Sequence, residues 1–273
     1  MMDFGGQVNF WRAPIDNDYG ANTPNIYKEW LTAGKKNIEV TSEVIKEENG
    51  SVTLNFKQNL LNGDAKLLQT YHIYSNGAIQ VINDFKALKG INPKNILLRG
   101  HKAKLPKGTH SNIYKFGNEF ILPKDYQIAT WYGRGPEESY LDRKSSANIG
   151  LFKNNINDLF TLYARPQENG NRSEIRWVEF SKINGVSLIF ASPESLNFSA
   201  SHFKTSDLDS GPYKKTTQSH VRLLTPREEV YLNIDGFISG VGGVNSWGAL
   251  PRKEYLLPYK DYYYTYWMIP KSN

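Results

Sequence analysis

The stretch YLNIDGFISGVGGVNSW, residues 231–247, decides how the rest of the chain is interpreted. It begins with the alternation of a β-strand, in which Leu232 and Ile234 share one face and Asp235 lies on the other. Three glycines follow within four positions, where the missing side chains allow a sharp turn or the close approach of another surface. The stretch therefore predicts a strand that ends in a glycine-rich loop.

Asn245 and Trp247 lie at the end of this loop. An indole ring beside amide and carboxylate side chains suits a sugar, because the C–H face of a sugar is apolar and its hydroxyls need donors and acceptors. The same residues also fit a plain hairpin whose tryptophan is buried in the core. The two interpretations differ in the exposure of Trp247.

The rest of the chain is dominated by β-strand patterns. Short segments recur with turn signals roughly every 8–12 residues, which is typical of an all-β sandwich or barrel. The chain has 273 residues, of which 39% are hydrophobic and 13% aromatic, enough for a sizeable core. It contains neither a repeat nor a linker rich in Pro, Gly and Ser. We therefore expect one all-β domain over residues 1–273.

One short N-terminal helix is expected between Thr23 and Gly34. Thr23 would be its N-cap, a proline follows at the first helical position, and Gly34 stands after its end. Ile26, Trp30 and Leu31 have the spacing of one buried helical face.

Composition excludes several classes of partner and site. Lys and Arg number 33 against 27 Asp and Glu, but the net charge of +6 is spread along the chain, so we expect no nucleic-acid partner. The absence of cysteine excludes disulfides and zinc–thiolate sites. No segment approaches the roughly 18 apolar residues of a membrane helix, and the first residues are no signal peptide. We expect a soluble chain without a membrane partner, either cytoplasmic or periplasmic.

Residues 9–20, NFWRAPIDNDYG, form the second informative stretch. Asp16 and Asp18 flank an amide, and together these groups could hold a cation or sugar hydroxyls. Such clusters more often satisfy their own backbone in a turn. Because this turn-rich stretch begins within ten residues of the start, we expect the chain to be a fragment of a larger protein.

The third stretch is WYGRGPEESYLDR at residues 131–143. Its first residues predict a strand, which ends in a loop at two glycines and a proline. It concentrates five charges: Arg134, Glu137, Glu138, Asp142 and Arg143. Paired carboxylates can act as acid and base in glycoside cleavage, but neighbours on an extended chain point to opposite faces. The alternative is a loop joined by Arg–carboxylate pairs.

The fourth stretch is RPQENGNR at residues 165–172, where Glu168 and Asn169 crowd a turn. Functional and structural interpretations are both open here. The five histidines show no metal-ligand spacing, so we predict no metal site. No pair of groups in the sequence makes a persuasive catalytic centre, and we predict no catalytic residue.

Taken together, the four stretches resemble the C-terminal domain, or small chain, of the β-galactosidases of glycoside hydrolase family 2. Related sequences carry R-A-P-x-D-N-D-x-G, W-x-G-x-G-P-x-E-x-Y-x-D-R, P-x-E-N-G and N-I-D-G-F-x-x-G-x-G-G-x-x-S-W in this order. The resemblance runs from about residue 9 to the end. One departure is Val244–Asn245, where the family often has paired acidic residues.

The resemblance implies a β-supersandwich similar to galactose mutarotase. It also implies that the two catalytic Glu residues lie in a TIM-barrel portion of the enzyme, with Mg²⁺ and Na⁺ bound outside this chain. The implied partners are that barrel and a galactoside, and the intact enzyme would be an oligomer. Gly20 matches the start of a mobile loop, so residues 20–24 would act as a flap.

The resemblance and the residue chemistry together suggest two groups of site residues. The residues expected to contact the substrate are Trp247, Asn245, Gly20, Asp16 and Asp18. The residues expected to support the site are Arg134, Glu137, Asp142, Arg143, Glu168, Asn169 and Asp235. The leading hypothesis is a non-catalytic domain that completes the barrel's active site. The alternatives are a free-standing carbohydrate-binding module, an aldose 1-epimerase-like enzyme and a purely structural assembly domain.

Overall fold

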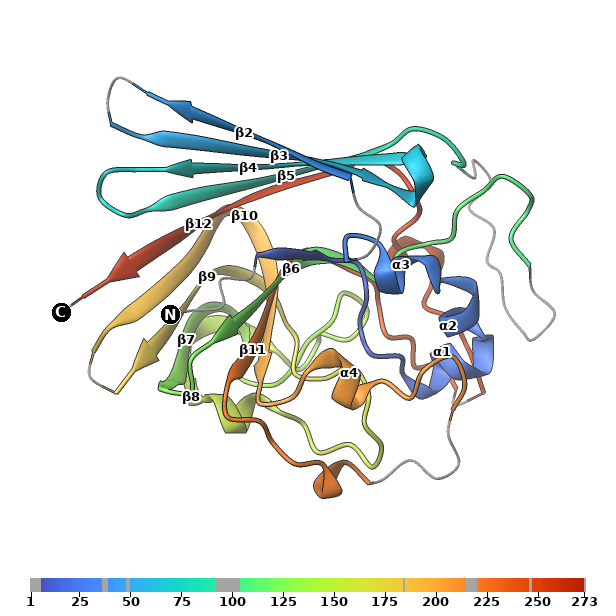
Figure 1. Cartoon of the computed structure of the whole chain (residues 1–273). Coiled ribbons are helices and arrows are strands. Elements are labelled where there is room, and N and C mark those ends of the chain that lie inside the picture. The colour runs from blue at the N-terminus through green and yellow to red at the C-terminus, as the bar shows by residue number, and fades with distance from the viewer. Residues whose placement is uncertain are drawn as a thin grey trace.

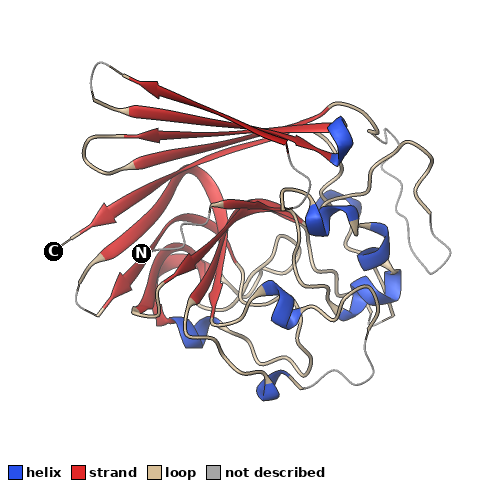
Figure 2. Cartoon of the chain, in the orientation of Figure 1, coloured by secondary structure: helices blue, strands red, loops and turns tan. Residues whose placement is uncertain are grey.

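Twelve strands form one curled antiparallel sheet in the part of the chain that the structure describes (Figure 1). The structure is a computed structural model, and it describes residues 6–35, 39–47, 50–91, 104–183, 185–214, 220–245 and 247–272. The predicted all-β class is confirmed: strands dominate and the helices are short (Figure 2). Within these ranges no helix has the length and apolar character needed to span a bilayer.

The elements follow one another along the chain as labelled in Figure 1. The strands are β1 (Gln7–Asn9), β2 (Glu39–Lys46), β3 (Val52–Leu60), β4 (Ala65–Ile73), β5 (Ile79–Ala87), β6 (Lys115–Leu122), β7 (Tyr126–Gly135), β8 (Asn148–Asn155), β9 (Arg172–Lys182), β10 (Ser187–Ser201), β11 (Val230–Ile238) and β12 (Tyr262–Lys271). The helices are α1 (Asp16–Ala21), α2 (Thr23–Ile26), α3 (Glu29–Thr32) and α4 (Thr205–Leu208), with 3-10 turns η1 (Leu61–Gly63), η2 (Ile156–Leu159), η3 (Val221–Leu223) and η4 (Lys253–Tyr255).

The long strand β10 is where the sheet divides. On one edge its first half pairs with β12 and its second half with β11, while β9 pairs along the other edge. The sheet continues from β12 through β5, β4 and β3 to β2, and from β11 through β6 to β1, while β7 and β8 extend from β9. Figure 1 shows the first group as an upper layer above the remaining strands. Strands distant in sequence, such as β6 and β11, therefore lie side by side.

Aromatic rings fill the core. Phe10 stacks on Phe116 with ring centroids 5.3 Å apart, and Phe85 and Trp30 meet them at steeper angles. All four side chains are fully buried. Tilted and edge-to-face rings add about 0.5–1.5 kcal/mol per pair beyond the area that they bury. This cluster joins the segment before α1 to both layers of the sheet.

The predicted helix over residues 23–34 is wrong in its continuity, because the segment forms two separate helical turns, α2 and α3. Thr23 does not cap a helix: it is buried, and its hydroxyl lies 2.6 Å from that of Tyr114. Trp30 is buried as expected, but Leu31 is 43% exposed and does not belong to the buried face. Tertiary contacts of Thr23 and the aromatic side chains thus override local helical propensity.

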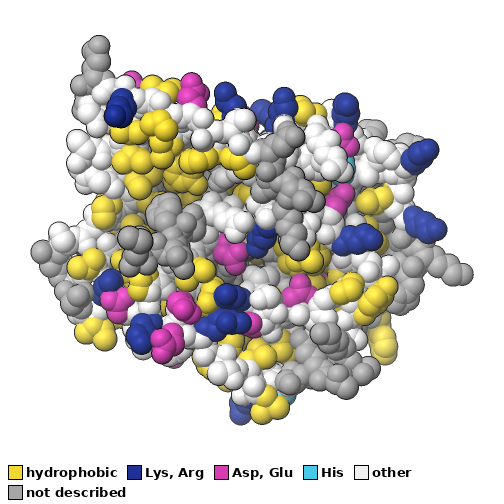
Figure 3. All heavy atoms as spheres, viewed as in Figure 1, with side chains coloured by type: hydrophobic (Ala, Val, Ile, Leu, Met, Phe, Trp, Pro, Cys, Tyr) yellow, Lys and Arg dark blue, Asp and Glu magenta, His cyan; other side chains and the backbone are white. Residues whose placement is uncertain are grey.

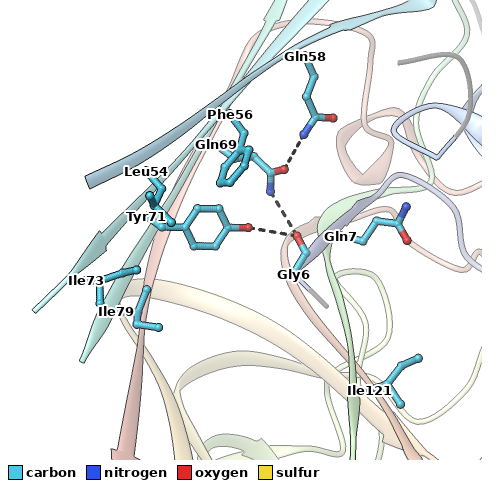
Figure 4. A pocket seen from close by; sticks show the side chains of 10 residues that line it. All are labelled: Gly6, Gln7, Leu54, Phe56, Gln58, Gln69, Tyr71, Ile73, Ile79 and Ile121. Carbon is cyan, nitrogen blue, oxygen red and sulfur yellow. Dashed lines mark hydrogen bonds between the residues drawn. The ribbon is translucent and has the colours of Figure 1, made fainter. Parts of the chain in front are cut away.

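A hollow of about 690 Å³ lies between strands β3–β5 and strand β6, and we call it the concave-face hollow (Figure 4). Most of its walls are apolar, and Figure 3 shows hydrophobic side chains gathered over this part of the sheet. Its polar floor is a chain of amides, in which Gln58 donates to Gln69 over 2.8 Å and Gln69 donates to Asn83 over 3.0 Å. None of the described residues that line it is His or Glu.

Strand β2 forms the outer edge of the upper layer and pairs with β3 on one side. Val40 and Val44 of this strand are exposed, Val44 to 61%. Glu43 and Lys46 place charges among them.

His110 ties three segments together. Its Nδ1 lies 2.9 Å from Oε2 of Glu29 in α3, and its Nε2 lies 3.1 Å from Oδ2 of Asp64, next to η1. The hydrogen bond to Glu29 is the largest cause of a raised pKa for His110; burial opposes it and Asp64 reinforces it. Folding therefore favours the charged form of the His110 imidazole.

We expect the His110 cluster to make stability depend on pH. Because folding raises the pKa of His110, its contribution to the free energy of unfolding is complete below the ordinary value of 6.5 and is lost as pH rises through the folded-state pKa. His110→Asn should therefore destabilise the chain more at pH 5.5 than at pH 9 in urea unfolding. In a Glu29→Gln background this difference should shrink. An equal loss at both pH values would contradict the assignment.

Candidate functional site

All four informative stretches of the sequence meet at one pocket of about 350 Å³. We call it the four-motif pocket, and it is lined by residues 15–17, Tyr140, Arg143, Tyr163, Gln167, Glu168, residues 241–243 and Asn245. The start of α1 and the loop after β11 are more than 200 positions apart in the sequence, so the sheet topology brings them together.

A buried ion pair holds the first stretch in place. Arg12 Nη1 lies 2.7 Å from Asp18 Oδ2, and both side chains are almost completely buried. The same Asp18 oxygen accepts a hydrogen bond of 2.8 Å from the backbone N–H of Ile15, at the start of α1. Arg12 also reaches the carbonyl oxygen of Gly240 at 3.5 Å. Asp18 is therefore part of the internal framework rather than of the pocket surface.

Asp142 holds the glycine-rich loop. Its two carboxylate oxygens accept hydrogen bonds from the backbone N–H groups of Val241, at 3.0 Å, and Gly242, at 2.8 Å. A Cβ at position 240 would lie 2.4 Å from an Asp142 oxygen, and Gly243 has a φ of +135°. The glycines are thus required by the close approach of a carboxylate and by backbone angles that other residues rarely adopt.

The loop that carries Trp247 is anchored through backbone contacts. Asn245 Oδ1 accepts from the backbone N–H of Trp247 at 2.9 Å. The backbone N–H of Gly248 donates a hydrogen bond of 3.3 Å to Asn17 Oδ1. Gly20 packs against Gly248 so closely that a Cβ at position 20 would lie 2.7 Å from the Gly248 Cα.

The Trp247 side chain itself is 88% exposed. The alternative of a core tryptophan in a plain hairpin is therefore wrong. An indole of this exposure, held on a fixed loop, is an available apolar surface for a flat partner.

Glu168 and Tyr140 give the pocket its electrostatic character. Burial raises the pKa of Glu168 to about 7, while Lys115 and Arg12 act to lower it and Asp235 and Glu138 to raise it. Tyr140 is fully buried, and its pKa is raised well above the usual value first by burial and next by the Glu168 carboxylate. The Glu168 carboxylate therefore helps to keep the Tyr140 hydroxyl protonated.

Asp235 lies behind this pocket in β11 and is completely buried. It pairs with Lys115 of β6 over 3.3 Å. Burial raises the pKa of Asp235 to about 6, although Lys115 acts to lower it. Its place is structural, since it joins two strands beneath the site.

Comparison with known proteins identifies the family. Residues 1–268 match the family model described as beta galactosidase small chain. The chain belongs to this family. It is 31% identical over 250 residues to a beta-galactosidase from Halalkalibacterium halodurans, covering 91% of this chain and 22% of that protein. It is 29% identical over 274 residues to a beta-galactosidase from Streptococcus thermophilus, covering 100% of this chain and 24% of that protein.

This member of the small-chain family thus spans about a quarter of the length of the curated relatives that it matches. Two solved structures show weaker likeness. A galactose mutarotase related enzyme from Lactobacillus acidophilus has 13% identity and a TM-score of 0.38, covering 85% of this chain and 71% of that one. An alpha-galactosidase from Lactobacillus brevis has 8% identity and a TM-score of 0.38, covering 87% of this chain and 26% of that one. The finer expectation of a supersandwich stays a prediction.

Several other residues expected to contact substrate or support the site are engaged by partners within the chain. Arg134 turns away from the pocket, and its Nε lies 2.6 Å from Oε2 of Glu174. Asn169 accepts from the backbone N–H of Thr161 at 2.7 Å. Asp16 lies in the pocket wall but is paired with Lys214 at 2.7 Å.

Three residues at this pocket are not among the predicted site residues: Glu138, Tyr140 and Tyr163. Glu138 accepts hydrogen bonds from Arg143, from the Tyr163 hydroxyl and, at 2.9 Å, from the backbone N–H of Gly170. The prediction named its neighbour Glu137, which is exposed and does not line the pocket. The alternation rule said that one of the adjacent pair faces inward, but it gave no signal for which one.

Two expectations for this member of the family stay predictions. Residues 20–24 lie in α1 and α2 and at the junction between them, and the structure shows one arrangement of them, so the flap is a prediction. Within the described ranges no group of three or more His, Asp or Glu side chains is placed to hold a metal ion. The binding of Mg²⁺ and Na⁺ outside this chain is likewise a prediction.

We expect Gly20→Ala to destabilise the Trp247 loop. Alanine is favoured over glycine in a helix by about 1 kcal/mol, so local propensity alone would stabilise this variant. The contact with Gly248 should reverse the sign and lower the free energy of unfolding by about 1–3 kcal/mol in urea titration. Gly211→Ala separates the two possible costs: its Cβ would meet nothing within 4 Å but its φ is +85°, whereas Gly20 has no such φ and its cost would come from the contact alone. A stabilised Gly20→Ala would show that the two backbones are not in firm contact.

Proposed function

We propose that this chain is a non-catalytic part of a β-galactosidase and that it completes the galactoside-binding site of a TIM-barrel catalytic part. The exposed Trp247 on its anchored loop carries the proposal. The family match and the relatives, which bear the name beta-galactosidase and are about four times as long, support it.

The Trp247 loop is preorganised for a partner. Asn17 and Gly20 of α1 both contact Gly248, and Asn245 accepts the backbone N–H of Trp247, so contacts within this chain hold the backbone of the Trp247 loop. A rigid aromatic surface loses little conformational entropy on binding, and the C–H face of a sugar is a suitable partner. A retaining glycosidase needs two carboxyl groups about 5 Å apart at the scissile bond, and in this proposal the barrel supplies both.

A complementation experiment tests whether the barrel part and this chain are both needed for activity. The 273-residue chain is mixed with the barrel-containing remainder of a β-galactosidase, and hydrolysis of a nitrophenyl galactoside is followed. We expect activity in the mixture and none in either part alone. Cleavage of lactose by this chain alone, or equal activity of the remainder with and without it, would overturn the proposal.

Trp247→Ala in the assembled enzyme should raise KM with a much smaller change in kcat. Loss of one stacked ring is worth about 1–3 kcal/mol by analogy with aromatic stacking on bases, or roughly a fivefold to 150-fold loss of affinity. Tyr263→Ala is the control, since this residue is an exposed aromatic on β12 outside the site. Equal falls in kcat and kcat/KM would instead place the indole in the transition state alone.

A further inference from the structure

Strand β2 leaves one edge of the sheet free along its whole length. It is the last strand in the order of the sheet, and no described strand pairs with its second edge (Figure 1). Its pairing with β3 runs from Glu39 to Lys46 without a bulge, and the strand contains neither proline nor glycine. Short length, prolines and bulges are the usual devices that protect a sheet edge, and β2 has none of them. Its outward N–H and C=O groups can therefore pair with another strand.

One face of β2 gains from being covered. Val40 and Val44 lie opposite Gln58 and Leu54 of β3, which line the concave-face hollow. Because opposed residues of an antiparallel pair share a face of the sheet, both valines extend the wall of this hollow to the edge. Val40 is 50% exposed and Val44 is 61% exposed. A strand added at the edge would shield these two side chains from water.

A second copy of β2 matches this edge. Two copies related by a two-fold axis perpendicular to the sheet pair antiparallel, with residues of the same face opposed. When the axis passes at Ser42, each Val40 lies opposite Val44 of the other copy, and each Thr41 lies opposite Glu43. The valines then form two aliphatic pairs, and the Thr41 hydroxyl can donate to the Glu43 carboxylate. The ladder covers residues 39–45 of both copies.

The charges of β2 select this register over its neighbours. A shift of two residues in one direction would set Glu43 opposite Glu43, and in the other direction opposite Glu39. Like charges directly opposite each other are destabilising. A shift of one residue would oppose different faces of the strand, so that the valines no longer meet. Parallel in-register pairing would set each charge opposite its own copy. The arrangement centred on Ser42 is therefore the longest ladder that opposes no like charges.

We propose that β2 is a self-association edge, at which two copies of this chain join into one continuous antiparallel sheet about a two-fold axis at Ser42. Such a contact is closed, because each copy uses its β2 edge once and association stops at two. The proposal does not depend on the proposed function, since β2 and the four-motif pocket share no residue.

A disulfide at the axis tests the register. The chain has no cysteine, so Ser42→Cys introduces one thiol per copy. Opposed Cα atoms of an antiparallel pair lie about 4.5–5.5 Å apart, which a disulfide can span. Thr41→Cys is the matched control: it is also exposed on β2, but the two copies of residue 41 would be offset by two positions and lie roughly 8–9 Å apart. Oxidation of the 273-residue chain should give about tenfold more covalent dimer for Ser42→Cys than for Thr41→Cys.

Sedimentation velocity measures the association without a cross-link. The unmodified chain should show a monomer–dimer equilibrium that depends on concentration. Val44→Lys should raise the dimer Kd about tenfold or more, because the symmetry places the change at two valine pairs. Its urea midpoint should not change, since the replaced side chain is exposed. Ile183→Lys, at an 86% exposed aliphatic residue just after β9, is the control and should dimerise as the unmodified chain does.

Several outcomes would overturn the self-association edge. These are a chain that stays monomeric at millimolar concentration, equal cross-linking of Ser42→Cys and Thr41→Cys, or a dimer that Val44→Lys leaves intact. Assemblies that continue to enlarge with concentration would contradict a closed pair. A monomeric chain whose Val44→Lys variant loses activity in the mixture with the barrel-containing remainder would show that the edge contacts that part instead.

Discussion

The ion pair between Arg12 and Asp18 is the contact on which the site depends. Both charges are removed from water, so deleting either one would leave the other buried and unpaired, at a cost of about 3–5 kcal/mol. Arg12 also reaches the Gly240 carbonyl, and Asp18 also holds the start of α1. A single pair thereby fixes the first and last of the four stretches relative to each other. Once these positions are set, the pocket between them has a defined shape.

Most of the polar residues in the four stretches serve the backbone rather than a ligand. Asp142, Asn169 and Glu138 each accept hydrogen bonds from N–H groups of loops that would otherwise have no partner. These loops carry the groups that remain available, above all the exposed indole of Trp247. This division explains why a chain without a predicted catalytic pair has such dense clusters of charge. The charges determine loop geometry, and the loop geometry determines what a partner meets.

Local patterns predicted the fold class, because strands and turns are determined by residues that lie within a few positions of one another in the sequence. They failed for the helix over residues 23–34, where the Thr23 hydroxyl is used by Tyr114 instead of the helix end. The candidate site needed information that local patterns lack. The meeting of residues 15–17 with the loop after β11 follows from the pairing of distant strands, and the position of the Trp247 backbone depends on the contact of Gly20 with Gly248. The choice of Glu138 over Glu137 likewise depends on which face the folded loop turns inward.

The outer strand β2 has a consequence for the chain in isolation. Its second edge presents backbone donors and acceptors next to the exposed Val40 and Val44. Such an edge is a template for amyloid-like growth, in which a strand of another molecule extends the ladder. Glu43 and Lys46 oppose this growth, because stacking identical strands would bring like charges together. Salt, which screens these two charges, should therefore favour growth at this edge.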